Sequence, residues 1–414
     1  MIEDRKKIAI IGSGISGMAC AHFLHPHHEI TLFEKDQRVG GHSHTVMAGD
    51  DPLDTGFMVY NEVTYPLLTR LFKELEVATK PTSMSFSVQH CEDGLEFNGG
   101  SLNLLFGQRK NLFRPRFWKM LLQINRFNKE TIAELQKPEE STLTLAQYVD
   151  ERGYGQDFLR WYLSPMAAAV WSSPPEKIKD FPAITLMRFW HNHGFLGLDT
   201  QHPWRTVTGG SQEYVKKITA PFADRIQKGD PVLSISPENE VKTASGASSK
   251  FDLIISAAHA DQALALLSQP TPLEQEVLSS FPYQKNKAVL HSDEQFMPQT
   301  RRCWASWNYR ITGTQHSTIY WMNNLQGASA AKNFFVSINP SAPISEEHLI
   351  KELDYEHPLF DLRSIAAQKR ISELHHANSG RYFCGAWQRY GFHEDGLWSA
   401  FRLCEKILGR SPWS

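Results

Sequence analysis

The first pattern of apolar and polar positions in the chain is a short apolar run that ends in a cluster of glycines. Residues 8–11 read IAII, and such a continuous run is typical of a strand buried on both faces of a parallel sheet. Apolar residues available for one buried face predict a helix over 14–24, and EITLFE at 29–34 predicts a second strand. The order strand, helix, strand predicts the start of a parallel α/β sheet.

The glycines of the first turn fit the binding of a dinucleotide. Gly12 allows the tight turn out of the strand, Gly14 lets backbone approach a bound group, and Gly17 lets the helix pack on the sheet. Because the helix N-terminus carries free N–H groups and a partial positive charge, a pyrophosphate is its natural ligand. The residues of this turn predicted to bind the cofactor are Gly12, Ser13, Gly14, Ile15, Ser16 and Gly17.

An acid, Glu34, closes the second predicted strand. A carboxylate at this place accepts hydrogen bonds from the hydroxyls of an adenosine ribose, and it would repel a 2′-phosphate. The pattern therefore favours NAD or FAD over NADP. The alternative is a chance cluster of glycines before a helix, and the complete order of strand, helix, strand and acid argues against it.

Later segments differ in their patterning. Residues 96–200 look largely helical, whereas NKAVLHSD, STIYWMNN and NFFVSINP in 271–375 mix apolar and polar residues as strands do. The stretch PENEVKTASGASSKFD, with SGASS at its centre, predicts a surface hairpin. We therefore expect a discontinuous cofactor domain of residues 1–95, 200–270 and 376–414, and a substrate domain of residues 96–199 and 271–375.

Composition and charge narrow the class of protein. The chain has 414 residues, of which 41% are hydrophobic, and this is long enough for two domains. The formal net charge of −2 gives no sign of nucleic-acid binding. Five cysteines without a CxxC pair argue against a disulfide framework or a zinc site, and they fit a cytoplasmic protein. No apolar run is long enough to span a membrane.

The segment after the second predicted strand distinguishes the two dinucleotides. EKDQRVGGHSHTV resembles the ExxxRxGGRxxT pattern of the flavin amine oxidase superfamily, which includes monoamine oxidases, protoporphyrinogen oxidases and carotenoid desaturases. The resemblance implies FAD, held here by Lys35, Arg38, Gly40 and Gly41. His42 departs from the pattern, since the family usually has arginine there. GGHSHTV is more similar to a bacterial subgroup whose genes often accompany enzymes like cyclopropane-fatty-acyl-phospholipid synthases.

Three further motifs extend this resemblance along the chain. They are DTGFMVYNEVTYPLLTRLFKELEV, the strand DPVLSI, and RYFCGAWQRYGFHEDGLWSAFRLCEKIL near the C-terminus. In the family the last one ends a strand and starts a helix whose amides face the flavin, here near Gly396. The further FAD contacts that the resemblance implies are His42, Gly56, Phe57, Val232, Gly385, Glu394, Gly396 and Leu397. It also implies a Rossmann-like FAD-binding domain with an inserted α+β substrate domain, a mixed sheet plus helices.

Few residues stand out as catalytic. The segment NKAVLHSDEQFM resembles the strand on which amine oxidases carry a lysine near the flavin, which selects Lys287, or Lys285 after a shift of two. A solvent-exposed lysine is the simpler reading. His291 follows on the same face, and a buried, hydrogen-bonded histidine is the common outcome. The two HxH pairs, at 42–44 and 191–193, lack a third ligand of telling spacing, so we predict no metal site.

A basic and aromatic segment covers residues 106–129, FGQRKNLFRPRFWKMLLQINRFNK. It carries seven Lys or Arg and no acid, and a helix should begin near Pro115. One reading is a membrane-surface element that admits a lipid. The other is a helix whose aromatic face packs on the protein and whose charges are solvated. RNA binding is least favoured, because no RNA-binding motif accompanies the segment.

The sequence thus predicts an FAD-dependent oxidoreductase in which hydride moves between flavin N5 and an apolar substrate. Eleven tryptophans, several of them in the predicted substrate domain, would suit a large apolar cavity for a lipid acyl chain, or simply an aromatic core. Oxidation of a small amine is the first alternative. A non-catalytic flavoprotein serving a partner methyltransferase and an NAD-only dehydrogenase are the others. We expect a cytoplasmic protein that is able to associate with membranes.

Overall fold

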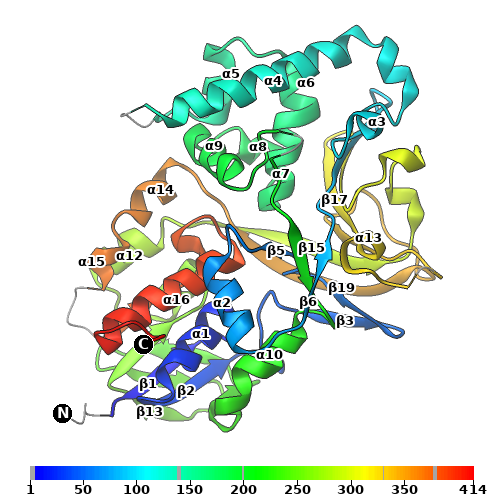
Figure 1. Ribbon diagram of the computed structural model, residues 1–414. Helices are drawn as coiled ribbons and strands as arrows, with labels where there is room; N and C mark the ends of the chain where they lie inside the picture. Colours follow the sequence, from blue (N-terminus) through cyan, green and yellow to red (C-terminus); the bar gives the residue numbers. More distant parts are fainter. Residues whose placement is uncertain (1–4, 138–140, 198–199, 330, 376–379) are drawn as a thin grey trace.

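A five-stranded parallel sheet forms one end of the molecule (Figure 1). The computed structural model describes residues 5–137, 141–197, 200–329, 331–375 and 380–414. The strands run in the order β10 (Ile226–Lys228), β2 (Glu29–Glu34), β1 (Lys7–Ile11), β14 (Leu253–Ser256) and β20 (Arg381–Phe383). Both strands predicted at the start of the chain are confirmed, and α1 (Ile15–Leu24) lies between them.

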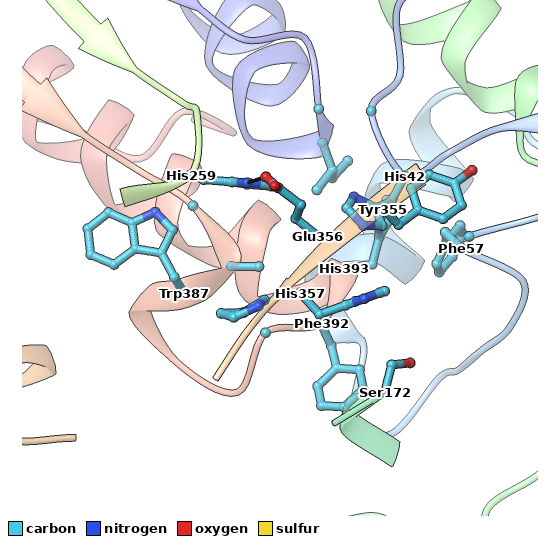
Figure 2. A pocket seen from close by; sticks show the side chains of 18 of the residues that line it. His42, Phe57, Ser172, His259, Tyr355, Glu356, His357, Trp387, Phe392 and His393 are labelled. Atoms are coloured by element: carbon cyan, nitrogen blue, oxygen red, sulfur yellow. Dashed lines mark ion pairs between the residues drawn. The ribbon is translucent and has the colours of Figure 1, made fainter. Parts of the chain in front are cut away.

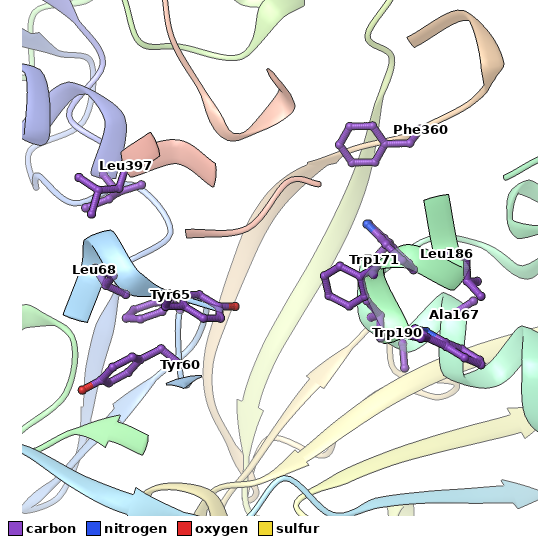
Figure 3. Close-up of a cluster of buried hydrophobic side chains, with 14 of the residues drawn as sticks. Tyr60, Tyr65, Leu68, Ala167, Trp171, Leu186, Trp190, Phe360 and Leu397 are labelled. Atoms are coloured by element: carbon purple, nitrogen blue, oxygen red, sulfur yellow. The ribbon is translucent and has the colours of Figure 1, made fainter. Parts of the chain in front are cut away.

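The first and last helices of the chain cover one face of this sheet together. Helix α1 packs along α16 (His393–Leu408), which in turn contacts α2 (Pro66–Glu74). Gly396 makes the approach possible, because a Cβ there would lie 2.8 Å from Ile15 Cγ2, and the Ser16 hydroxyl donates to the Gly396 carbonyl at 2.9 Å. Figure 3 shows Leu397 beside Leu68 and Tyr65 in the resulting core.

The other face of the parallel sheet packs against a second apolar cluster. Its members come from the sheet and from α11 (Ala260–Leu266), α12 (Pro272–Leu278), α14 (Leu362–Gln368) and α15 (Ile371–Leu374). A small antiparallel sheet of β11 (Val232–Ile235), β12 (Glu240–Thr243) and β13 (Ser248–Lys250) adjoins it. The turn between β12 and β13 is the predicted surface hairpin.

A seven-stranded mixed sheet stands beside the parallel one. It is antiparallel except for the parallel pair β16·β7. Its order is β19 (Leu349–Pro358), β15 (Tyr283–His291), β18 (Phe335–Ile338), β17 (Gln315–Trp321), β16 (Trp307–Thr312), β7 (Phe86–His90) and β8 (Leu95–Asn98). The predicted domain boundary at residue 95 falls within its β7–β8 hairpin.

Helices cover one end of the mixed sheet, at the top of Figure 1. They are α3 (Leu102–Leu105), α4 (Pro115–Leu135), α5 (Leu145–Glu151), α6 (Gln156–Phe158), α7 (Ser164–Trp171), α8 (Pro175–Ile178) and α9 (Ala183–Asn192). Helix α4 begins at the predicted proline, whose missing N–H and fixed φ suit a first helical position. Its inner face contributes Phe117, Met120 and Phe127 to the core, where Trp190 is fully enclosed.

Short elements join these layers. They are β3 (Thr45–Ala48) paired with β4 (Asp51–Asp54), the sheet of β5 (Tyr60–Asn61), β9 (Trp204–Val207) and β6 (Thr79–Thr82), and helices α10 (Gln212–Thr219) and α13 (Met322–Gln326). Asp54 ties them together, because its buried carboxylate accepts hydrogen bonds from Ser211, Thr45 and Gln326. None of the described helices is both long and apolar enough to cross a membrane.

Candidate active site

Two glycines of the first turn are required by the fold itself. Gly12 has φ +98°, which favours glycine, and its N–H donates to the Phe33 carbonyl of β2 at 2.8 Å. A Cβ on Gly17 would lie 1.8 Å from the Gly12 carbonyl oxygen, so only glycine lets α1 pack against the strand end. Both roles are those predicted from the sequence.

Gly14 is different, because it faces open space. A Cβ there would meet nothing within 4 Å. The second glycine pair runs directly alongside: the Gly40 N–H donates to the Ser13 carbonyl at 3.0 Å, and a Cβ on Gly41 would lie 3.0 Å from Gly14 Cα. The two glycine segments thus form one cradle of bare backbone at the N-terminus of α1, suited to a pyrophosphate.

Glu34 lies at the edge of this cradle. One carboxylate oxygen accepts hydrogen bonds from the N–H of Ser13, at 3.0 Å, and from the Ser13 hydroxyl; the other accepts from the Asp36 N–H at 3.0 Å. A carboxylate has about four acceptor sites. Glu34, which lines the cavity, therefore keeps capacity for a ribose hydroxyl while it holds the glycine turn in place.

A single large cavity extends from the cradle toward the mixed sheet. Its volume is about 1340 Å³. The predicted contact residues that line it are Gly12, Ser13, Gly14, Ile15, Ser16, Glu34, Lys35, Arg38, Gly41, His42, Gly56, Phe57, Val232 and Gly385. Segments from the start, middle and end of the chain therefore meet around one space.

Two buried donors point to an anionic ligand in this cavity. Nη1 of Arg38 and Nε2 of His42 are buried and have no hydrogen-bond partner in the protein. Buried polar atoms are nearly always paired, so such atoms beside a backbone cradle mark the place of a missing partner. A phosphate group fits both, and the residues present therefore fit a dinucleotide with its pyrophosphate at the cradle.

The comparison with protein families decides between the dinucleotides. The model of the family of flavin containing amine oxidoreductases matches residues 15–332. The chain belongs to this family. FAD is therefore its cofactor, and NAD alone is set aside. No curated protein matches the sequence.

Several solved structures share the fold over nearly the whole chain. Wild-type putrescine oxidase bound to putrescine is 12% identical, with 98% of this chain and 99% of that chain covered and a TM-score of 0.70. A CLA-producing fatty acid isomerase from P. acnes is 12% identical, with coverage of 98% and 99% and a TM-score of 0.71. Cyclohexylamine oxidase from Brevibacterium oxydans is 15% identical, with coverage of 98% and 100% and a TM-score of 0.68.

His393, which the sequence did not single out, contributes to the wall of the same cavity. Its ring stacks on Phe57 with centroids 3.9 Å apart and planes 12° apart, and its Nε2 shares a 2.7 Å hydrogen bond with the Tyr214 hydroxyl. Burial lowers the pKa of His393 to about 3, so the imidazole is neutral near pH 7. These contacts join the loop after Gly56 to the start of α16.

A second group of neutral rings faces the same cavity (Figure 2). His42 stacks on Tyr355 at 4.8 Å and lies 5.1 Å from His357, ring centre to ring centre. Asn286 Nδ2 lies 2.8 Å from Nδ1 of His357 and donates to the Ser172 carbonyl at 3.0 Å. Burial, with the nearby His259, lowers the pKa of His357 to about 4, so this wall carries little positive charge.

Lys287 does not face this wall. In the β15–β19 ladder Asn286 is paired with Tyr355, whereas Lys287 is paired with Asp354 and therefore points to the opposite face of the sheet. Lys287 Nζ forms an ion pair with Glu352 at 3.1 Å at the rim of the cavity, and both side chains are 51% exposed. Lys285 shares that exposed face. Asn286 takes the inward position, while both lysines line the cavity with exposed side chains, and a catalytic role for Lys287 stays a prediction.

Other residues singled out from the sequence prove structural. Glu394 is buried, and its carboxylate accepts from the N–H groups of Leu67 and Leu68, both at 3.0 Å, where it caps α2 rather than facing the cavity. Leu397 lies in the apolar core, and α16 begins at His393, before Gly396. His291 is fully buried and bonded to the Ser337 hydroxyl at 2.7 Å.

The two histidines of the HxH pair at 191–193 lie in different places, one at the surface and one in the cavity wall. His193 lines the cavity, stacks on Phe189 at 3.9 Å and bonds the Phe189 carbonyl, while His191 is exposed. Within the described ranges, no three His, Cys, Asp or Glu side chains are grouped to hold a metal ion.

Proposed function

We propose that the protein transfers hydride between flavin N5 and the acyl chain of a lipid. The observation that supports this substrate class is the large apolar part of the cavity lining, which we call the apolar section. We define it by its lining side chains: Met58, Val59, Tyr65, Met84, Val170, Trp171, Phe189, Phe195, Trp204, Trp307, Tyr320, Leu325 and Phe392. Aromatic and aliphatic walls of this extent favour a hydrocarbon ligand.

The charges around the cavity favour the same conclusion. Among the described residues, the carboxylates that line it are Glu34, Asp36, Asp354 and Glu356. The first two follow one another at the end of β2, beside the glycine cradle, Asp354 is exposed, and Glu356 is paired with His259 at 3.4 Å. No described carboxylate lies in the apolar section, so an ammonium group entering it would be desolvated without a counter-ion.

Bound FAD supplies the chemistry of hydride transfer at N5. In the oxidative direction one C–H bond of the chain would give up a hydride to the flavin, the adjacent C–H would release a proton to water at the rim of the cavity, and a C=C bond would form; the reverse reaction would take up both and saturate that bond. The walls of the apolar section exclude water and align the chain. His42, which lines the cavity, is neutral because burial holds its pKa well below the usual range, so its ring adds no charge to the wall.

Oxidation of a small amine is the second candidate. The rings of Trp171, Phe189 and Phe392 lie together, with Phe189 and Phe392 stacked at 4.8 Å, and aromatic faces attract ammonium groups. The solved structures of this fold include enzymes named for amines and one named for a fatty acid, so the fold does not discriminate between them.

Anaerobic spectroscopy of the FAD-loaded protein distinguishes the two. Saturated phospholipid should bleach the oxidised flavin, or unsaturated phospholipid should restore the absorbance of the photoreduced flavin, while simple amines do neither. Bleaching by amines with no response to any lipid would contradict the proposal.

A matched pair of variants locates the substrate. Met84→Glu places a carboxylate in the apolar section, and Met47→Glu places one on the exposed strand β3. The lipid response should be lost in Met84→Glu and kept in Met47→Glu, with FAD content unchanged in both.

A further inference from the structure

Exposed apolar side chains are concentrated in one short part of the chain. Eleven large hydrophobic residues are exposed among those described, and six of them fall between residues 102 and 132. They are Leu102, Leu112, Phe113, Trp118, Leu122 and Ile132. Scattered single residues of this kind need no explanation, but a cluster on one surface marks an interaction site.

The 3-10 helix η1 (Arg109–Phe113) and the start of α4 present four of these side chains together. Nε1 of Trp118 donates to the Leu112 carbonyl at 2.9 Å, which fixes the indole against η1. Leu122 follows Trp118 by one helical turn, and Phe113 is 86% exposed. We call Leu112, Phe113, Trp118 and Leu122 the η1–α4 surface.

This surface is not needed for the core. Helix α4 already buries Phe117, Met120 and Phe127 on its inner face, against the other helices. Figure 1 shows α4 along the edge of the molecule farthest from β1 and α1. One aromatic face of the basic segment therefore packs inward, as the second reading of the sequence predicts, and another apolar face is left outside.

The charges within the segment that carries the η1–α4 surface are of one sign. Residues 106–129 contain seven Lys or Arg and no acid. Arg116 and Arg126 are paired with Asp157 and Glu130, at 2.6 and 2.7 Å. Lys110 and Lys119, on either side of Phe113, are exposed and form no ion pair with a described residue. An apolar patch bordered by unneutralised cations is complementary to a layer of anionic headgroups above hydrocarbon.

We propose that the η1–α4 surface docks on a bilayer that contains anionic phospholipid. Phe113, Trp118 and Leu122 would enter the boundary between headgroups and acyl chains, and Lys110 and Lys119 would lie among the phosphates. The docking goes beyond the proposed reaction, since it concerns how the protein meets a membrane rather than what reacts in the cavity.

Sedimentation of the FAD-loaded protein with vesicles tests the proposal. Vesicles of phosphatidylcholine with phosphatidylglycerol should bind the protein, vesicles of phosphatidylcholine alone should bind it at least tenfold less, and added salt should release it. Phe113→Ser with Leu122→Ser should reduce the partition coefficient at least tenfold. Leu233→Ser with Leu362→Ser, which removes exposed leucines elsewhere, should leave it unchanged.

A charge pair gives a second comparison. Lys110→Glu with Lys119→Glu should abolish binding to the anionic vesicles, whereas Lys242→Glu with Lys250→Glu, on the β12–β13 hairpin, should not. The flavin spectrum of each variant confirms that it is folded.

Several results would overturn the docking proposal. One is that the protein does not bind anionic vesicles. Another is that both serine double variants bind them equally well. A third is that Phe113→Ser with Leu122→Ser keeps vesicle binding and instead loses a dimer or RNA binding. Binding to vesicles whose lipid never changes the flavin spectrum would instead refute the proposed substrate and leave the docking standing.

Discussion

Substitution of Gly14 separates the folding of the first turn from its use as a cofactor cradle. Gly14 has φ −64° and ψ −179°, which alanine adopts without strain, and its Cβ would meet no protein atom within 4 Å. Gly14→Ala should therefore stabilise the FAD-free protein by about 0.4–1 kcal/mol, because alanine restricts the unfolded chain. With FAD bound, the added methyl meets the cofactor. Such overpacking costs about 1–3 kcal/mol, which corresponds to roughly 5- to 150-fold weaker binding.

Two measurements on the same variant test this reasoning. Urea unfolding of the FAD-free protein gives the free energy of unfolding, and titration of FAD, followed by flavin fluorescence, gives the dissociation constant. Gly17→Ala is the control for folding, because its Cβ would lie 1.8 Å from the Gly12 carbonyl oxygen, and it should not fold. Gly14→Val should take up no FAD. Wild-type affinity in Gly14→Ala, or a large loss of its stability without FAD, would refute the account.

Three further predictions concern the cavity and the buried histidines. Glu34→Gln should weaken FAD binding by about 1–3 kcal/mol, the scale of a charged hydrogen bond, whereas Glu29→Gln on the exposed start of β2 should not; unchanged titration curves would exclude the ribose contact. Lys287→Met should leave the rate of flavin reduction by substrate unchanged, while Asn286→Ala should slow it. If rapid mixing shows slow reduction in Lys287→Met and an unchanged rate in Asn286→Ala, Lys287 is the catalytic residue after all. Stability should fall between pH 6.5 and about 4, because buried histidines such as His291, whose pKa is lowered to about 4 by burial, stay neutral while the unfolded chain takes up protons. The two carboxyls with raised pKa values at the start of α16 oppose this trend but are fewer, and a melting temperature that rises across the same window would contradict it.

The nucleotide-binding end of the molecule could be read from the sequence because local rules determine it. An apolar run, a glycine turn and a helix stand next to one another in the chain, and the clash that Gly17 avoids involves a residue only one turn away. Pro115 marks the start of α4 for the same local reason. Such features need no knowledge of the tertiary fold.

The reacting end could not be read in this way. Asn286 and Lys287 are neighbours, and which of them points inward depends on which face of β15 lies against the cavity; a shift of one residue in the pairing with β19 reverses the answer. The stacking of His393 on Phe57 joins the two ends of the chain. Glu394 resembled a cofactor ligand by its motif, yet its partners are the backbone N–H groups of α2. Only the packed structure contains that information.

The lipid composition of cells tests the central claim most directly. Mass spectrometry would compare cells that express the wild-type protein with cells that express the Gly14→Val variant, which should lack FAD. The account predicts that the acyl chains of membrane phospholipids differ between the two in their number of C=C bonds, seen as mass differences of two hydrogen atoms. Identical phospholipids, together with a change in the amine pool that depends on the wild-type protein, would contradict it.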